Sequence, residues 1–158
     1  MKKFIKFFAL YLITVITGWW VSSYVSFYNI TPDIIIIVAI GISIFNKEIT
    51  SFMFAFFCGL FLDFMGSYLF GAYALCLLFA ARMVMVLREK IDFHSVFTQV
   101  LLVSAMSFFI KISYGLLGLV FTGEILFGEL KYLLIVSVIN GLIAPLVIAI
   151  MPIFSRDK

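Results

Sequence analysis

The residues from Gly59 to Gly71, GLFLDFMGSYLFG, place one carboxylate, Asp63, and three glycines inside an otherwise almost unbroken apolar run. Hydrocarbon provides no water to solvate a carboxylate, and a charged side chain at the centre of a membrane helix costs roughly 2.5 to 3.5 kcal/mol. We therefore expect Asp63 to have a partner, a cavity or a function that offsets this cost. It is the first candidate for a functional position in the chain.

The composition of the whole chain indicates an integral membrane protein. Of its 158 residues, 65% are hydrophobic and 12% are charged, whereas a soluble domain carries about 25% charged residues. Lys2, Lys3 and Lys6 precede an apolar run from Phe7 to Phe27. This run is longer than the roughly 7 to 15 apolar residues of a signal peptide. We interpret it as a retained first membrane span.

Apolar runs predict an all-α membrane protein with six transmembrane helices in one bundle, forming a single domain over residues 1–158. The expected spans are residues 4–28, 32–45, 49–65, 70–87, 95–121 and 131–154. A span needs about 20 residues unless it is short, tilted or paired with a neighbour. The second and third together are too long for one span, and Asn46, Lys47 and Glu48 lie where a tight hairpin would fall. The alternative to two separate spans is that these two segments form a re-entrant pair.

Lysine and arginine residues gather on one side of this arrangement. If the N-terminus is cytoplasmic, the cytoplasmic residues are Lys2, Lys3, Lys6, Lys47, Arg88, Lys90, Arg156 and Lys158. Lys131 falls on the other side, and Arg82 and Lys111 fall within spans. Short cytoplasmic loops of membrane proteins are enriched in Lys and Arg. Both termini are therefore expected in the cytoplasm.

The sequence contains no recognisable catalytic or metal-binding motif. Its one histidine, His94, falls in a predicted loop, so a two-histidine metal motif cannot form. Cys58 and Cys76 fall within spans, which indicates small packing residues rather than a disulfide framework. No phosphate-binding loop, dinucleotide fingerprint or serine elbow is present. We expect a protein that is not an enzyme and has no cofactor, metal or nucleic-acid partner.

Small and polar residues recur at steps of three and four in every long span, which places each set on one helix face. The sets are Thr14, Gly18 and Ser22; Ser51, Ala55, Gly59 and Asp63; Ala72, Cys76 and Ala80; Ser104, Ser107, Lys111, Gly115 and Gly118; and Ser137, Gly141 and Pro145 with Asn140 beside them. Membrane helices pack closely through such faces. Two interpretations remain open: the faces form the interior of the bundle, or some of them dock the helix of a partner.

Two charged residues within the spans are expected to lie at similar depth. At 1.5 Å per residue, Asp63 and Lys111 both fall in the outer half of the membrane. Because each charge alone would be costly, we predict that Asp63 and Lys111 are neighbours that neutralise one another. Arg82 lies nearer the cytoplasmic face and is expected to extend toward lipid phosphates.

A series of short motifs extends from Pro32 to Ala74. Pro32-Asp33 opens an isoleucine run, and a charged hairpin follows; then come Gly59-Leu60, Asp63, Gly66 and a Leu69-Phe70-Gly71 turn into the next span. This series resembles the MreD family of bacterial rod-shape-determining proteins, which is also similar in size, in its six spans and in its cytoplasmic termini. The chain departs from the family at Gly71-Ala72-Tyr73, where many relatives have Leu-Gly, a small or polar residue and a histidine.

The resemblance implies a non-catalytic subunit of the cell-elongation complex in the bacterial inner membrane, where it would contact membrane lipids. Such a subunit would bind the partner MreC and help to organise RodA, a class B penicillin-binding protein and MreB filaments, and so maintain rod shape during peptidoglycan synthesis. Replacement of Gly59, Asp63, Gly66 or Gly71 is expected to have the largest effect on the protein, because these residues determine helix packing and turn geometry. The other candidate structural or interaction residues are Pro32, Asp33, Arg82, Lys111 and Asn140.

The family fold is also similar to the substrate-binding subunits of energy-coupling-factor vitamin transporters, which supplies a rival hypothesis. An outward-facing cavity would then hold a vitamin, and the face of Thr14, Gly18 and Ser22 would dock a coupling subunit. The candidate ligand contacts would be Asp33, Asp63, Lys111 and Asn140. Polar aromatic and amide residues are sparse near the outer ends, which counts against this hypothesis. A proton- or ion-coupled carrier is a third hypothesis, and it depends on Asp63 alone.

Overall fold

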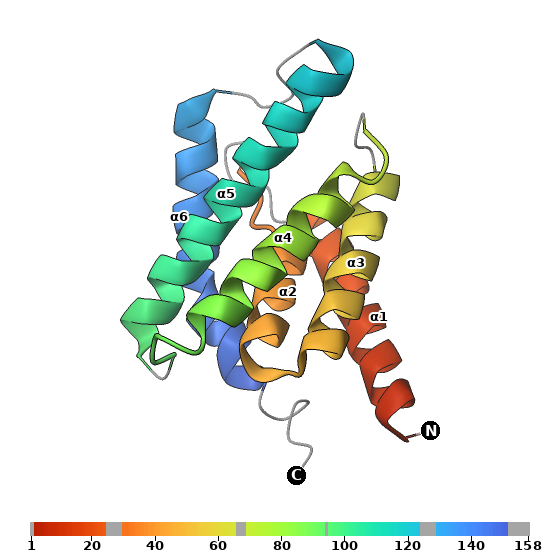
Figure 1. The fold of residues 1–158 in the computed structure, drawn as a ribbon, viewed down its shortest axis with the longest axis vertical. Coiled ribbons are helices and arrows are strands. Elements are labelled where there is room, and N and C mark those ends of the chain that lie inside the picture. Colours follow the sequence, from red (N-terminus) through yellow and green to blue (C-terminus); the bar gives the residue numbers. More distant parts are fainter. Residues whose placement is uncertain (1, 25–29, 66–68, 94, 124–128, 152–158) are drawn as a thin grey trace.

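The computed structural model describes residues 2–24, 30–65, 69–93, 95–123 and 129–151, and within these residues the chain forms six helices (Figure 1). They are α1 (Lys2–Tyr24), α2 (Ile34–Phe45), α3 (Glu48–Phe64), α4 (Ala72–Leu87), α5 (Val96–Thr122) and α6 (Leu130–Ile150). The helices lie within a few residues of the six segments expected from the sequence. Residues 25–28 and 152–154 of the expected spans, Gly66 and His94 lie outside the described residues.

Three helices are long and apolar enough to cross a membrane, namely Ile5–Tyr24 within α1, α5 and α6. The other three are shorter, with 12 residues in α2, 17 in α3 and 16 in α4. At 1.5 Å per residue α2 is roughly 18 Å long, whereas the hydrocarbon core of a bilayer is about 30 Å thick. The fold is thus a helical bundle of the kind found in membranes, in which long helices accompany short ones.

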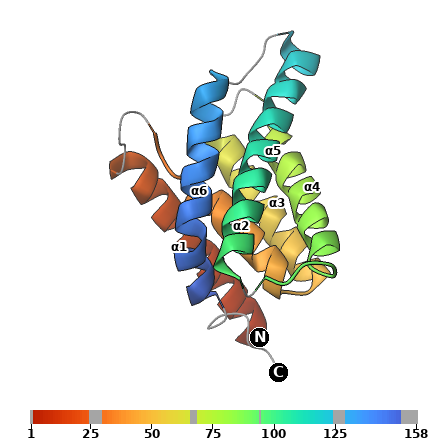
Figure 2. The same ribbon diagram turned by 90° about the vertical axis from the view of Figure 1, so that its left-hand side faces the viewer.

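One end of the bundle carries several basic residues. The first helix begins there and the last helix ends there, and the α2–α3 and α4–α5 connections lie at the same end (Figures 1 and 2). Lys6, Lys47, Arg88 and Lys90 belong to these segments, so we call this the basic end. Its orientation toward the cytoplasm remains a prediction.

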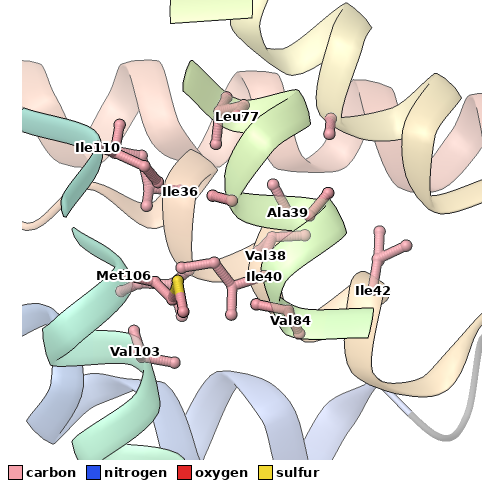
Figure 3. Packing of buried hydrophobic residues seen from close by; sticks show 14 of the residues in the cluster. Ile36, Val38, Ala39, Ile40, Ile42, Leu77, Val84, Val103, Met106 and Ile110 are labelled. Atoms are coloured by element: carbon pink, nitrogen blue, oxygen red, sulfur yellow. The ribbon is translucent and has the colours of Figure 1, made fainter. Parts of the chain in front are cut away.

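Helix α2 forms the centre of the bundle. The ten residues from Ile35 to Ile44 are all buried, and α2 contacts each of the other five helices. A helix that is apolar on every side is stable only when it is surrounded, and the isoleucine-rich sequence of α2 has no face suited to water. Figure 3 shows side chains of α2, α4 and α5 meeting in this core.

Glycines allow neighbouring helices to approach closely. A Cβ atom added to Gly59 of α3 would lie 2.3 Å from the Cα atom of Ala74 in α4. One added to Gly141 of α6 would lie 2.7 Å from the carbonyl oxygen of Val100 in α5. Because backbone atoms occupy these positions, any side chain there would push the helices apart.

The faces of small and polar residues point mainly into the bundle. Their buried members are Thr14, Gly18, Ser51, Ala55, Gly59, Asp63, Ala72, Cys76, Ala80, Ser107, Gly115, Gly118, Ser137, Asn140 and Gly141. Ser22 is exposed. Of the two interpretations left open by the sequence, the structure therefore favours the bundle interior for most of these residues.

The C-terminal end of α2 is held by side chains from other parts of the chain. Nη1 of Arg88 donates to the carbonyl oxygens of Ser43 and Asn46, and the hydroxyl of Ser51 donates to the carbonyl oxygen of Ile42 at 3.4 Å. The last four carbonyls of a helix have no partner within it, and the helix dipole favours a cation nearby. Sequence analysis counted Arg88 only as a cytoplasmic charge and missed this role.

Replacing Arg88 with methionine is expected to destabilise the protein by roughly 1.5 to 3 kcal/mol, the usual range for hydrogen bonds to a charged group. Methionine keeps most of the side-chain volume but leaves the carbonyls of Ser43 and Asn46 without this donor. The unfolding midpoint of the purified protein in mild detergent measures the effect. Lys90→Met, at an exposed position in the same turn, is the control, and an equal loss in both variants would contradict the role of Arg88.

Candidate functional site

The Asp63 carboxylate caps a helix other than its own. Asp63 lies near the end of α3, is 4% exposed, and accepts hydrogen bonds from the first turn of α4. The N–H group of Tyr73 donates to Oδ1 at 3.0 Å, and that of Ala74 donates to Oδ2 at 3.2 Å. The residue that precedes α4, Gly71, has no side chain to cap it. Asp63 therefore supplies from α3 the acceptor that a capping Asp or Ser usually provides locally.

Gly59 makes this capping contact possible. It precedes Asp63 by four residues, so both lie on one face of α3, and its missing side chain leaves room for the backbone of Ala74. Gly71, directly before α4, has a φ of 90°, a conformation that favours glycine. The positive end of the α4 dipole also stabilises the buried carboxylate. The motif residues Gly59, Asp63 and Gly71 thus form one structural unit.

A second polar group, which we call the Asp33 cluster, consists of Asp33, Ser107, Lys111 and Asn140. Nζ of Lys111 lies 2.7 Å from Oδ2 of Asp33. The backbone N–H of Asp33 donates to Oδ1 of Asn140 at 2.9 Å, and Nδ2 of Asn140 lies 3.4 Å from both Oδ2 of Asp33 and Oγ of Ser107. Ser107 and Asn140 are fully buried. The cluster joins the start of α2 to α5 and α6.

The depth of the Asp33 cluster explains its composition. Because α2 is short, Asp33 lies only roughly 18 Å from the basic end along the helix. In the membrane arrangement expected from the sequence, this places it inside a hydrocarbon layer about 30 Å thick. Non-helical backbone at such a depth must find its partners within the protein. Asn140 accepts from the Asp33 N–H, Lys111 neutralises the Asp33 carboxylate, and Pro32 has no N–H that needs a partner.

The structure gives Lys111 a different acidic partner from the one predicted. The predicted Asp63–Lys111 ion pair is wrong, because Lys111 pairs with Asp33, while the Asp63 carboxylate binds the amides of α4. The prediction compared depths within two spans and did not include Asp33, which lies at the edge of its span. Only the shortness of α2 brings Asp33 to the level of Lys111.

Tyr73 joins the start of α4 to two neighbouring helices. Its N–H binds Asp63 in α3. Its ring stacks on Tyr114 of α5, with centroids 4.2 Å apart and an interplanar angle of 17°. The start of α4 is thus held to α3 by hydrogen bonds and to α5 by an aromatic contact. Sequence analysis named Tyr73 only as part of the Gly71-Ala72-Tyr73 turn and did not name Tyr114. It placed Ser107 on a helix face but did not identify it as a partner of Asn140.

Arg82 lies apart from both sites. Its Nη1 atom is 3.3 Å from Oε1 of Glu48, and both side chains are 58% exposed. Such an exposed ion pair contributes at most about 1 kcal/mol. The sequence did not suggest Glu48 as a neighbour, and the expected contact of Arg82 with lipid phosphates remains a prediction.

The chemistry of the two sites is suited to holding helices together. Within the described ranges, no group of three or more His, Cys, Asp or Glu side chains could hold a metal ion. Cys58 and Cys76 are buried free thiols. The charges at Asp33, Asp63 and Lys111 meet groups from other helices, so each charge fixes the position of one helix relative to another.

Comparisons of the chain with family models, curated proteins and solved structures give no match. The resemblance to the MreD family therefore depends on the motif residues between Pro32 and Ala74.

Breaking the Asp33–Lys111 pair is expected to be costly in either single variant. Lys111→Met and Asp33→Asn should each cost about 2 kcal/mol, less than the roughly 3 to 5 kcal/mol of a fully buried pair, because the two side chains are 15% and 27% exposed. The double variant should cost less than the sum, with a coupling of at least about 1 kcal/mol. Unfolding midpoints in detergent measure all three.

The control for this double-mutant cycle is a second cycle, which combines Asp63→Asn with Lys111→Met. Their coupling should be smaller, because the Asp63 carboxylate binds the amides of Tyr73 and Ala74. A larger coupling for Asp63 with Lys111 than for Asp33 with Lys111 would show that the pairing is wrong.

Proposed function

We propose that this chain is a non-catalytic membrane subunit of the bacterial cell-elongation complex, of the MreD type. The observation that carries the proposal is the position of the residues behind the resemblance. Pro32 and Asp33 enter the bundle at the start of α2, and Gly59, Asp63 and Gly71 form the α3–α4 contact. These five motif residues therefore lie at positions on which the packing of the helices depends, as expected of a subunit with a scaffold role.

The proposal includes six membrane crossings, with both termini in the cytoplasm of a bacterial inner membrane. The location of Lys6, Lys47, Arg88 and Lys90 at one end of the bundle supports this orientation, because cytoplasmic loops are rich in such residues. The short helices α2, α3 and α4 pack against one another, which allows them to cross as a group that thins or distorts the bilayer locally.

The expected role is to bind MreC and through it to help organise RodA, a class B penicillin-binding protein and MreB filaments. Helix α1 offers the most accessible surface for the helix of a partner. Only 11% of its apolar window is buried, against 39% for α5 and α6. Ile16, Trp19 and Trp20 are each more than half exposed. An apolar partner helix could pack there without displacing any part of the bundle.

The test is to tag the C-terminus in the native host, extract the protein in mild detergent and identify co-purifying proteins by mass spectrometry. Recovery of MreC, RodA and a penicillin-binding protein is the expected result, and depletion of the chain should turn rods into spheres. Trp20→Ala should reduce MreC recovery more than Leu142→Ala, which alters the exposed face of α6. Normal rods after complete depletion, with none of these partners recovered, would exclude the proposal.

A second candidate function is that of a substrate-binding subunit of an energy-coupling-factor vitamin transporter. It is favoured by one observation, the convergence of Asp33, Lys111 and Asn140, which were all named as candidate ligand contacts. The same purification separates the two functions. A vitamin bound to the purified protein, together with co-purifying ATPases and a coupling subunit, would replace the elongation-complex proposal.

A further inference from the structure

Two charged side chains, Arg82 and Glu48, interrupt an outer face of the bundle that is otherwise apolar. The exposed side chains of α4 recur at steps of three and four, which places them on one helix face. Arg82 is the charged residue among them, and the others are Leu75, Phe79, Met83 and Val86. On α3, the exposed residues that follow Glu48 are Ile49, Met53, Phe56, Phe57 and Phe64. The surroundings of this ion pair are thus suited to hydrocarbon rather than to water.

Both charges lie near the basic end. Glu48 is the first residue of α3, directly after the α2–α3 connection, which lies at that end (Figure 1). Arg82 precedes the last residue of α4 by five positions, or roughly 8 Å along the helix. In the membrane arrangement expected from the sequence, the basic end lies among the lipid headgroups. Long charged side chains near the ends of membrane helices extend toward that level.

The ion pair leaves most of the hydrogen-bonding capacity of both side chains unused. Nη1 of Arg82 donates to Oε1 of Glu48 at 3.3 Å. A guanidinium has five N–H donors and a carboxylate has two oxygens, and neither side chain makes another hydrogen bond to the residues that the structure describes. Each side chain is 58% exposed. The remaining N–H groups and the second carboxylate oxygen are therefore available to a ligand from the membrane.

A cation directly beside an anion matches a zwitterionic headgroup. Phosphatidylethanolamine carries a phosphate and a primary ammonium, joined by a short ethanolamine linker. The phosphate can accept hydrogen bonds from the guanidinium of Arg82, and the ammonium can donate to the free oxygen of Glu48. Phosphatidylglycerol offers the phosphate but no cation, and Glu48 repels its negative charge. The pair thus favours the zwitterionic lipid over the anionic one.

We propose that Arg82 and Glu48 form a binding site for the headgroup of phosphatidylethanolamine in the leaflet at the basic end. Sequence analysis expected a lipid phosphate at Arg82 alone. Glu48 adds an acceptor for the ammonium, and this determines the class of headgroup. The acyl chains then extend over Met53 of α3 and Phe79 of α4, exposed apolar residues farther from the basic end. This inference depends on the membrane arrangement and not on a role in cell elongation.

The test measures which lipids the full chain retains. The chain is purified in mild detergent, mixed with equal amounts of phosphatidylethanolamine and phosphatidylglycerol, and analysed by native mass spectrometry. Glu48→Gln should lower the retained phosphatidylethanolamine several-fold and raise the retained phosphatidylglycerol, because Arg82 then stands as a lone cation. Lys90→Met, which removes an exposed cation at the same end, should leave phosphatidylethanolamine unchanged. Unchanged retention of phosphatidylethanolamine by Glu48→Gln would overturn the proposal.

A double variant separates lipid binding from a purely structural ion pair. Arg82→Met combined with Glu48→Gln leaves no unpaired charge, so a structural pair predicts that retention returns to that of the unmodified chain. A headgroup site predicts that retention of phosphatidylethanolamine stays several-fold lower, and recovery in the double variant would overturn the proposal.

Cross-linking in native membranes identifies the occupant of this face directly. A photoreactive amino acid at Met83, an exposed position beside Arg82, should capture phosphatidylethanolamine. Capture of a protein in place of lipid would show that a partner covers the ion pair, and would also overturn the proposal.

Discussion

Replacing Asp63 with alanine is expected to lower the stability of the protein by about 3 kcal/mol, because one buried and one partly buried N–H group lose their acceptor at roughly 1 to 3 kcal/mol each. These groups belong to Tyr73 and Ala74 in the first turn of α4. Water replaces a lost cap in soluble proteins, but it has little access to this site, where Asp63 is 4% exposed. The unfolding midpoint in detergent and the steady-state abundance in membranes should both decrease.

Asp63→Asn provides the informative comparison. Asparagine keeps one oxygen acceptor but points an amide toward the second N–H group, so we expect about half of the loss seen with alanine. Glu48→Gln is the matched control, because Glu48 is an exposed carboxylate whose ion pair with Arg82 contributes at most about 1 kcal/mol. If Asp63→Ala were no worse than Glu48→Gln, the capping role of Asp63 would be refuted.

Replacing Gly59 with alanine is expected to cost at least about 2 kcal/mol, as overpacking of a well-packed core does. The new Cβ atom would lie 2.3 Å from the Cα atom of Ala74 and 2.6 Å from its nitrogen. Backbone atoms cannot rotate away, so α3 and α4 must separate, and this also lengthens the hydrogen bonds to Asp63. The loss should appear even though alanine favours a helix over glycine by about 1 kcal/mol.

Gly41→Ala is the matched control, since it makes the same change in another buried helix. The Cβ atom there would meet the sulfur of Met151 at 2.7 Å, and a methionine side chain can move because it has three rotatable bonds. We expect a change of less than about 1 kcal/mol, since the gain in helix propensity offsets the adjustment. Equal losses at Gly41 and Gly59 would show that the close approach of α4 is not the cause.

The positions of the helices could be predicted because their signals are local. Apolar runs end at breaks such as Asn46-Lys47, which lie between α2 and α3 in the structure. The grouping of basic residues at one end of the bundle could be predicted from the same division of the chain into spans. Burial of the small-residue faces is less certain from sequence, since a face that packs inside a bundle and a face that docks a partner have the same spacing.

The partners of the charged residues could not be predicted from depth alone. Pairing of Lys111 with Asp33 requires that α2 begin at the level of Lys111 in α5, and this level depends on how the helices pack in the core. One signal was available, because Pro32-Asp33 before an apolar run is typical of a helix start. A helix start at Asp33 leaves backbone N–H groups there that need a partner from outside the helix. The capping of α4 by Asp63 had a similar signal, because the short connection through Gly71 keeps the start of α4 close to the end of α3.

The central position of α2 has a consequence for how the protein is made. This helix emerges from the ribosome before its neighbours α5 and α6, yet the groups that bind Asp33, the residue directly before its first turn, are Lys111 and Asn140 on those two helices. At roughly 18 Å, α2 is too short to be inserted as an independent span. We therefore expect α2 to reach its final position only after α5 and α6 have been made, since Asp33 gains its ion-pair partner only with Lys111.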